Sequence, residues 1–161
     1  MRVVKTTSVF GAAALLVGVF GWCEPSSASE LTDALKGEWS GSGEIALANG
    51  KSERIRCRGE TREVSDNAVE QFFHCASTDK EFDFSTSMHF SEGRARGDWR
   101  APDRSGTLSG PASPGSLQLH LASSDGEGNL SATIGSCSQS INVTGWSDEL
   151  KSLSAKLSKD C

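Results

Sequence analysis

EFDFSTSMHF, which spans residues 81–90, decides the fold class because apolar and polar side chains alternate along most of its length. Its phenylalanines and Met88 fall on one side of an extended chain, whereas the acidic, histidine and most serine side chains fall on the other. A two-residue period is that of a β-strand with one buried face. The stretch therefore predicts a strand that packs against an apolar interior.

The same alternation recurs in short runs from Trp39 onward, with Gly, Asn, Asp, Ser and Pro between the runs. Asn49-Gly50 matches the two-residue turn of a β-hairpin, whose central residues both need positive φ. The short connections predict an antiparallel meander, and residues 30–36 add one short helical turn before it. The expected strands are 38–47, 52–63, 68–77, 80–90, 94–101, 105–112, 116–123, 128–135, 139–145 and 151–159.

Glycines are expected to share the apolar face of several strands, at positions 41, 43, 59 and 97. Glycine within a strand marks a bend or a close backbone approach, and glycines spread over several strands let a sheet curl. Closing the sheet also removes the exposed edges that an open one would keep. We therefore expect an all-β fold, an antiparallel meander of about 8–10 strands curled into a barrel.

The N-terminal segment has the pattern of a secretory signal peptide. A basic start is followed by an uncharged apolar run over residues 9–20, which is shorter than the roughly 20 residues that span a bilayer. Small residues at Ser26 and Ala28 suit a cleavage site. We expect residues 1–28 to be removed and residues 29–161 to form a single periplasmic or secreted domain without a stable membrane span.

The cysteines predict disulfides. Cys23 falls in the leader, where lipidation is the alternative to its removal, and an even number of cysteines follows it. An exported chain without a C-x-x-C pair favours disulfides over a zinc or redox site. A hairpin centred on Asp66 and another centred on Glu149 each bring two cysteines into register and keep apolar residues on one face. The expected disulfides are Cys57–Cys75 and Cys137–Cys161.

The same registers predict further neighbours across the strands. The C-terminal hairpin should set Ile141 opposite Leu157, and a tight turn near Ser91-Glu92 should set Met88 opposite Ala95.

Large apolar side chains then gather on one face and have two interpretations. As a core they fill a small barrel, and as a ligand site they line an apolar cavity near one mouth. Packing density distinguishes these cases, and a sequence does not report it. The candidate ligand-lining residues are Trp39, Phe73, Phe82, Phe84, Met88 and Trp99.

No catalytic, metal or cofactor site is expected. The sequence contains no G-x-S-x-G, H-E-x-x-H or Gly-rich phosphate loop. His74, His89 and His120 fall on the polar faces of three different predicted strands, which indicates solvated side chains. Glu81 and Asp83 share one face of one strand, where neighbouring surface acids are common.

The charges argue against a nucleic-acid partner. The formal net charge is −5, whereas non-specific nucleic-acid binding needs a basic surface. All arginines beyond the leader lie between Arg54 and Arg104, in a segment that is also rich in carboxylates. This mixture predicts solvated strand faces with offset charges rather than a polyanion site.

Two resemblances add to these patterns. LKGEWSGSG at residues 35–43, IRCR at 55–58 and FHCAS at 73–77 resemble a group of small exported proteins from rhizobia-like alphaproteobacteria, which implies export. Gly37-Glu38-Trp39 is also similar to the Gly-x-Trp start of lipocalin-like (calycin) barrels. That similarity implies a first strand at one barrel end with Trp39 packed across it. The sequence does not assign the basic residue that packs on this tryptophan in such barrels.

Together these features predict an exported, non-enzymatic binding module of the lipocalin-like type, which holds a small apolar or amphipathic ligand in the barrel interior. The alternative is an envelope interaction protein with a filled core, similar to a protease inhibitor or a surface-associated protein, which acts on an envelope protein through loops or edges. Neither function requires a cofactor.

Overall fold

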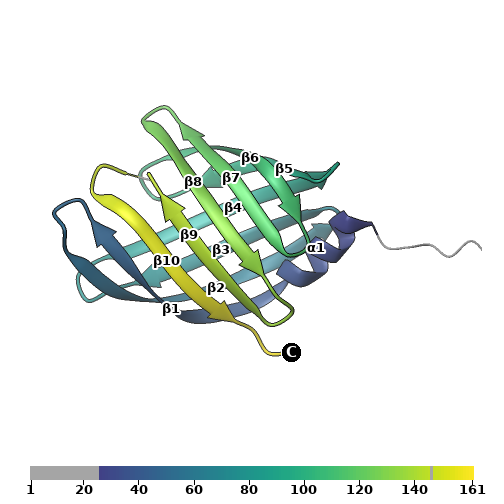
Figure 1. The fold of residues 1–161 in the computed structure, drawn as a ribbon, viewed down its shortest axis with the longest axis horizontal. Coiled ribbons are helices and arrows are strands. Elements are labelled where there is room, and N and C mark those ends of the chain that lie inside the picture. The colour runs from purple at the N-terminus through teal and green to yellow at the C-terminus, as the bar shows by residue number, and fades with distance from the viewer. Residues whose placement is uncertain (1–25, 146) are drawn as a thin grey trace, which may run out of the picture.

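A computed structural model describes residues 26–145 and 147–161. Within these residues it contains one helix and ten strands (Figure 1). They are α1 (Ser27–Leu35), β1 (Gly37–Leu47), β2 (Ser52–Ser65), β3 (Ala68–Ala76), β4 (Glu81–Ser91), β5 (Arg94–Arg100), β6 (Ser105–Ser113), β7 (Ser116–Ser123), β8 (Gly126–Ile134), β9 (Ser138–Thr144) and β10 (Leu150–Ser158).

The strands form a closed antiparallel barrel in which each strand pairs with its neighbours in the sequence and β1 pairs with β10. This arrangement confirms the predicted all-β meander, and every predicted strand is present. Inward side chains alternate with exposed ones along each strand, as in β4, where the buried Met88 lies between the exposed Ser87 and His89. Two-residue periodicity therefore located the interior correctly.

Both predicted disulfides are present, the first of them directly across the strand register. Cys57 faces Cys75 directly across β2 and β3, and a disulfide joins the two. Cys137 and Cys161 form the second disulfide from positions just outside β9 and β10. The predicted disulfide pairing is therefore correct at both ends of the chain.

The predicted register of the C-terminal hairpin is wrong by two residues. Ile141 faces Ala155 rather than Leu157. The backbone carbonyl of Glu149 accepts a hydrogen bond from the Ala48 amide in the β1–β2 connection, so Glu149 is not the centre of its own hairpin. A shift of two residues keeps every side chain on its predicted face, which is why burial was still predicted correctly.

The β4–β5 hairpin shows the same two-residue shift. Its turn is at Glu92-Gly93, where φ is 50° and 70°, and Met88 consequently faces Gly97 instead of Ala95. Positive φ at both central residues defines the type I′ turn, which follows the right-handed twist of the two strands. Glycine at the second position makes this turn more favourable than the expected one at Ser91-Glu92.

Helix α1 is longer than the single turn predicted. Ser26 caps it, because the Ser26 hydroxyl accepts a hydrogen bond from the Ser29 amide. Leu31, Thr32 and Leu35 are buried on one side of the helix, which lies across one end of the barrel (Figure 1). The helix thus closes that end with an apolar face.

The expected signal peptide is only partly covered by these observations. Residues 1–25 lie outside the described part of the chain. Residues 26–28 belong to the cap and first turn of α1, and the Ala28 carbonyl accepts a hydrogen bond from the Thr32 hydroxyl. Cleavage after Ala28 remains a prediction, and it would remove this first turn.

None of the described helices is both long and apolar enough to pass through a lipid bilayer.

Close approach of β1 and β10 depends on glycine. A Cβ atom added to Gly43 would lie 1.9 Å from the Ser154 carbonyl oxygen and 2.8 Å from the Ala155 Cα. Both obstacles are backbone atoms, which cannot move aside as a flexible side chain does. The strands can therefore keep their present spacing only without a side chain at this position.

We predict that Gly43→Ala lowers the free energy of unfolding by about 1–3 kcal/mol, because the two closing strands must separate. Gly115→Ala is the matched control, since the nearest atom to an added Cβ there is 3.9 Å away. Its effect should stay within about 0.5 kcal/mol. Urea unfolding followed by circular dichroism measures both values, and equal losses in the two variants would contradict the close-approach argument.

Candidate functional site

The barrel encloses an apolar cavity of about 60 Å³ between its strands and the end of α1. Side chains from α1, β2, β3, β4, β7, β8, β9 and β10 line it. A single water needs roughly 10–15 Å³ of such space, so the interior has room for more than one water but less than a typical ligand pocket of about 300–1,000 Å³.

Several inward-facing side chains along the cavity are only partly buried. In a filled barrel core such side chains would be almost completely covered, because protein interiors pack as densely as organic crystals. Most of them also border open pockets on the barrel surface, so their remaining exposure is shared between the interior and the outside. The partly buried lining residues are Phe73, Phe82, Phe84, Leu130 and Ile141.

One polar side chain in the cavity wall, Gln71, has hydrogen-bond partners at both its amide nitrogen and its amide oxygen. The Gln71 side-chain amide donates from Nε2 to the Thr61 hydroxyl at 3.1 Å, and the Thr86 hydroxyl donates to Gln71 Oε1 at 3.3 Å. All three side chains are buried. This row across β2, β3 and β4 is therefore a structural network that holds its own hydrogen bonds.

Gln139 on β9 differs from Gln71. It is 3% exposed and lines the cavity, yet its Nε2 has no hydrogen-bond partner among the described residues. A buried amide donor without a partner costs about 1–3 kcal/mol relative to a paired one. Such a group facing a cavity is where a ligand with a hydrogen-bond acceptor would gain most.

The predicted lining residues divide into two groups. Phe73, Phe82, Phe84 and Met88 all border the cavity. Trp39 and Trp99 are buried but are not part of its wall. Trp99 packs instead against Phe84, with ring centroids 6.1 Å apart. Gln139 lines the wall but was not among the predicted residues. The sequence did indicate its position, because Gln139 lies two and four residues before Ile141 and Val143 and therefore shares the apolar face of β9 with them.

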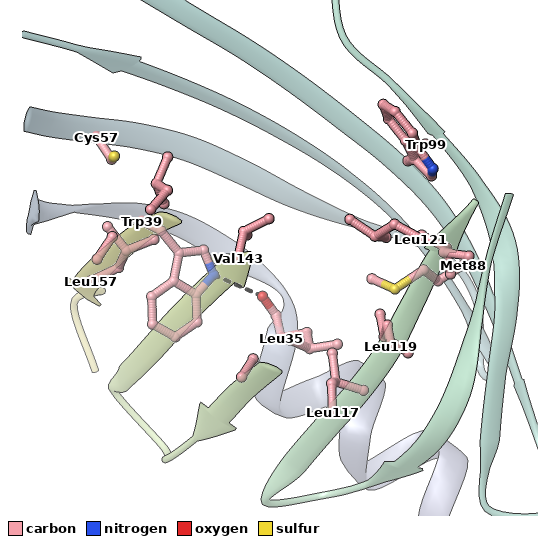
Figure 2. Packing of buried hydrophobic residues seen from close by; sticks show 14 of the residues in the cluster. Leu35, Trp39, Cys57, Met88, Trp99, Leu117, Leu119, Leu121, Val143 and Leu157 are labelled. Atoms are coloured by element: carbon pink, nitrogen blue, oxygen red, sulfur yellow. Dashed lines mark hydrogen bonds between the residues drawn. The ribbon is translucent and has the colours of Figure 1, made fainter. Parts of the chain in front are cut away.

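Trp39 closes the barrel end that α1 covers. Its indole Nε1 donates to the Leu35 carbonyl oxygen at 2.8 Å, so the last turn of the helix is attached to the first strand (Figure 2). The ring lies beside Leu157 of β10 in the same view. This placement is the one that the Gly-x-Trp similarity implied.

Lys159, just after β10, is the basic residue that sequence reasoning did not assign. Its Nζ lies 4.9 Å from the centre of the Trp39 ring and donates to the carbonyl oxygens of Ala34 and Lys36, each at 2.8 Å. A cation at the end of a helix is favourable because unpaired carbonyls and the helix dipole converge there. Lys159 thus joins the chain's last segment to α1.

Burial, and to a smaller extent the nearby Lys36 ammonium, lowers the pKa of Lys159. The lowered pKa shows that burial disfavours the charged form of the amine. The two carbonyl contacts and the indole face offset that cost.

We predict that Lys159→Met lowers the free energy of unfolding by about 1–3 kcal/mol, because it removes a charged donor to two carbonyls and a cation–π contact. The Trp39 environment should also change, which shifts the tryptophan emission. Lys156→Met on β10 is the control, since Lys156 is exposed on the outer face and forms neither contact. A Lys156 variant as unstable as the Lys159 variant would contradict the assignment.

The three histidines do not converge. His74 contacts Asp83 at 2.8 Å, His89 contacts Asn67 at 2.9 Å, and His120 lies 3.7 Å from Glu127. Within residues 26–145 and 147–161 there is no group of three or more acidic, histidine or cysteine side chains placed to hold a metal ion.

Comparison with solved structures places the fold. The chain superposes on Rv2717c from M. tuberculosis with a TM-score of 0.68 at 12% identity, over 86% of this chain and 100% of the other. It superposes on an S-type phycobiliprotein lyase, CPES, from Guillardia theta with a TM-score of 0.59 at 11% identity, over 84% and 94%. The fold is that of a calycin-like barrel.

A third calycin-like barrel, EF1p2_mFAP2b bound to DFHBI, superposes with a TM-score of 0.52 at 10% identity, over 83% of this chain and 100% of the other. No family model and no curated protein matches the sequence. At these identities the likeness shows the barrel fold alone, and the resemblance to rhizobial exported proteins stays an expectation.

Proposed function

We propose that this calycin-like barrel is an exported, non-enzymatic carrier of a small, mostly apolar ligand that presents a hydrogen-bond acceptor to Gln139. The observation that carries this proposal is the buried, unpartnered Nε2 of Gln139 in the wall of an apolar cavity. A protein that only needed a stable core would gain stability from an apolar side chain there.

Two further observations support a ligand in the interior. Phe73, Phe82 and Phe84 face the cavity but remain partly uncovered, and an apolar ligand would cover them. The barrels of similar fold include one bound to DFHBI and one named as a phycobiliprotein lyase. The unpartnered Gln139 amide beside this small cavity favours the carrier over the alternative of an envelope protein with a filled core.

The cavity wall supports binding rather than chemistry. Among the described residues its lining includes no acidic, basic or histidine side chain, and its two cysteines form a disulfide. General acid–base or nucleophilic catalysis needs such groups within reach of the substrate. The wall can enclose and orient a ligand, and we assign it no reaction.

The two disulfides support export. Two disulfides persist in oxidising compartments and are rare in the reducing cytosol. Together with the signal-peptide pattern in residues 1–28, they favour the periplasm or the cell exterior as the place where the barrel works. An apolar ligand would need a carrier in either aqueous compartment.

We expect cyclohexanone, a compact apolar molecule with one acceptor, to shift the NMR signal of the Met88 methyl group, which lines the cavity. Ala132→Leu should abolish the shift, because Ala132 lines the same cavity and a larger side chain fills it. Ala122→Leu is the control, since Ala122 is outside the lining, and it should respond as the native protein does. No shift in the native protein, or a persistent one in Ala132→Leu, would refute an interior site.

We predict that Gln139→Leu raises the free energy of unfolding of the empty protein by about 1–2 kcal/mol, because it removes an unpartnered buried amide. Gln71→Leu should instead lower it by a similar amount, since the Gln71 amide is fully bonded to Thr61 and Thr86. Urea unfolding measures both. The Gln139 variant should also lose any preference for cyclohexanone over methylcyclohexane, and a retained preference would contradict the role of Gln139.

A further inference from the structure

The outer face of the barrel carries a broad groove of about 1550 Å³ that extends over β10, β1 and β2 toward β3 and, on the other side, β7–β9. Three arginines of β2 and one lysine of β10 line it, and all four side chains are exposed. We call these residues the basic strip: Arg54, Arg56, Arg58 and Lys156. Among the described residues, Glu44 is the only carboxylate in the groove lining.

One carboxylate of the groove lining, Glu44 of β1, lies beside the basic strip, directly across from Arg54 in the strand register. None of its four cations forms an ion pair with a described carboxylate, whereas Arg62 pairs with Glu60 and Arg104 with Asp103. The sequence predicted that acidic and basic side chains would offset each other, but in the structure they do so in some places and not in the groove. Exposed arginines without a described ion pair also lie on β5, at Arg94 and Arg96, but the groove brings four cations together with one carboxylate in its lining.

Strand geometry sets the spacing of the strip. Outward residues two apart in β2 repeat every ~6.6 Å, so Arg54 and Arg58 lie about 13 Å apart along the strand. Lys156 lies in the same row as Arg56, with Ser42 of β1 between them. Adjacent strands are ~4.8 Å apart, which places Lys156 about 10 Å from Arg56. The three arginines thus form a row along β2, and Lys156 lies to one side of it.

The remainder of the groove lining consists mainly of small hydroxyl and amide side chains. They offer hydrogen-bond donors and acceptors between the cations, and because they are short they do not fill the groove. No phenylalanine or tryptophan of the described residues lines this groove. Polar lining residues directly across from members of the basic strip in the strand register are Ser40 and Ser42 of β1, His74 of β3 and Ser140 of β9.

We propose that the basic strip binds an acidic polysaccharide, whose repeated carboxylate or sulfate groups meet the cations while its hydroxyls meet the serines. Single-stranded nucleic acid is a poorer fit, because its bases stack on aromatic side chains that this groove lacks. An anionic membrane is a poorer fit too, because the described part of the groove lining lacks the aromatic side chains that would add insertion into the lipid to the electrostatic attraction. This binding is independent of the interior ligand.

The test is the binding of fluorescently labelled oligogalacturonate to the full protein, followed by anisotropy. The native protein should bind, and binding should weaken with added salt because each cation–anion contact releases counterions. Arg56→Ser combined with Arg58→Ser should weaken binding about tenfold, as expected for the loss of two exposed ionic contacts.

Arg94→Ser combined with Arg96→Ser is the matched control. Both residues are exposed on β5 and lie outside the groove, and the pair removes the same charge. This variant should bind within about twofold of the native protein. Equal weakening in both double variants would overturn the proposal, because binding would then follow net charge alone.

Other probes decide the class of partner. Neutral dextran should not bind, and a thymidine oligonucleotide and phosphatidylglycerol vesicles should bind more weakly than oligogalacturonate. Tighter binding of either of these two, or no binding of oligogalacturonate by the native protein, would overturn the assignment. An unchanged thermal unfolding midpoint in both double variants shows that any loss of binding is not a loss of fold.

Discussion

The pairing of β1 with β10 is the constraint on which the rest of the structure depends. Without this seam the sheet would have two open edges, and its apolar face would have no opposite wall. The seam requires very close backbone approach at Gly43, which faces Ala155. Everything inside the barrel, including the cavity and its polar wall groups, exists because these two strands meet.

Helix α1 and Lys159 secure one end of the barrel. The helix covers the end with Leu31 and Leu35, Trp39 is bonded to its last turn, and Lys159 bonds its final carbonyls. The Lys159 contacts join segments that are more than 120 residues apart in the sequence. This end is therefore a packed closure, whereas the cavity wall deeper in the barrel contains Gln139 without a partner.

Much of the fold could be predicted from the sequence, because a period of two residues places side chains on faces without any knowledge of tertiary contacts. The strands and both disulfides followed from it. Two hairpin registers were wrong by two residues, since periodicity is unchanged by such a shift and only turn geometry, as at Glu92-Gly93, decides it.

The candidate site was harder to predict. Sequence placed Phe73, Phe82, Phe84 and Met88 on the inner face, but it gave no measure of how completely they are covered. Lys159 was missed because its role comes from neighbours that are remote in sequence, whereas Gln139 was missed although its place on the apolar face of β9 was visible in the sequence. The basic strip was missed for a similar reason, since charges that balance along the chain separate when strands twist around a barrel.

The seam also has a consequence for how the chain reaches its native state. Its two strands are the first and last of the barrel, so the interaction that encloses the interior has nearly the greatest sequence separation the domain allows. Proteins dominated by such distant contacts fold slowly, and the ring cannot close until the final strand has been synthesised. The local Cys57–Cys75 hairpin can oxidise before closure, whereas Cys137–Cys161 must wait for the last residue.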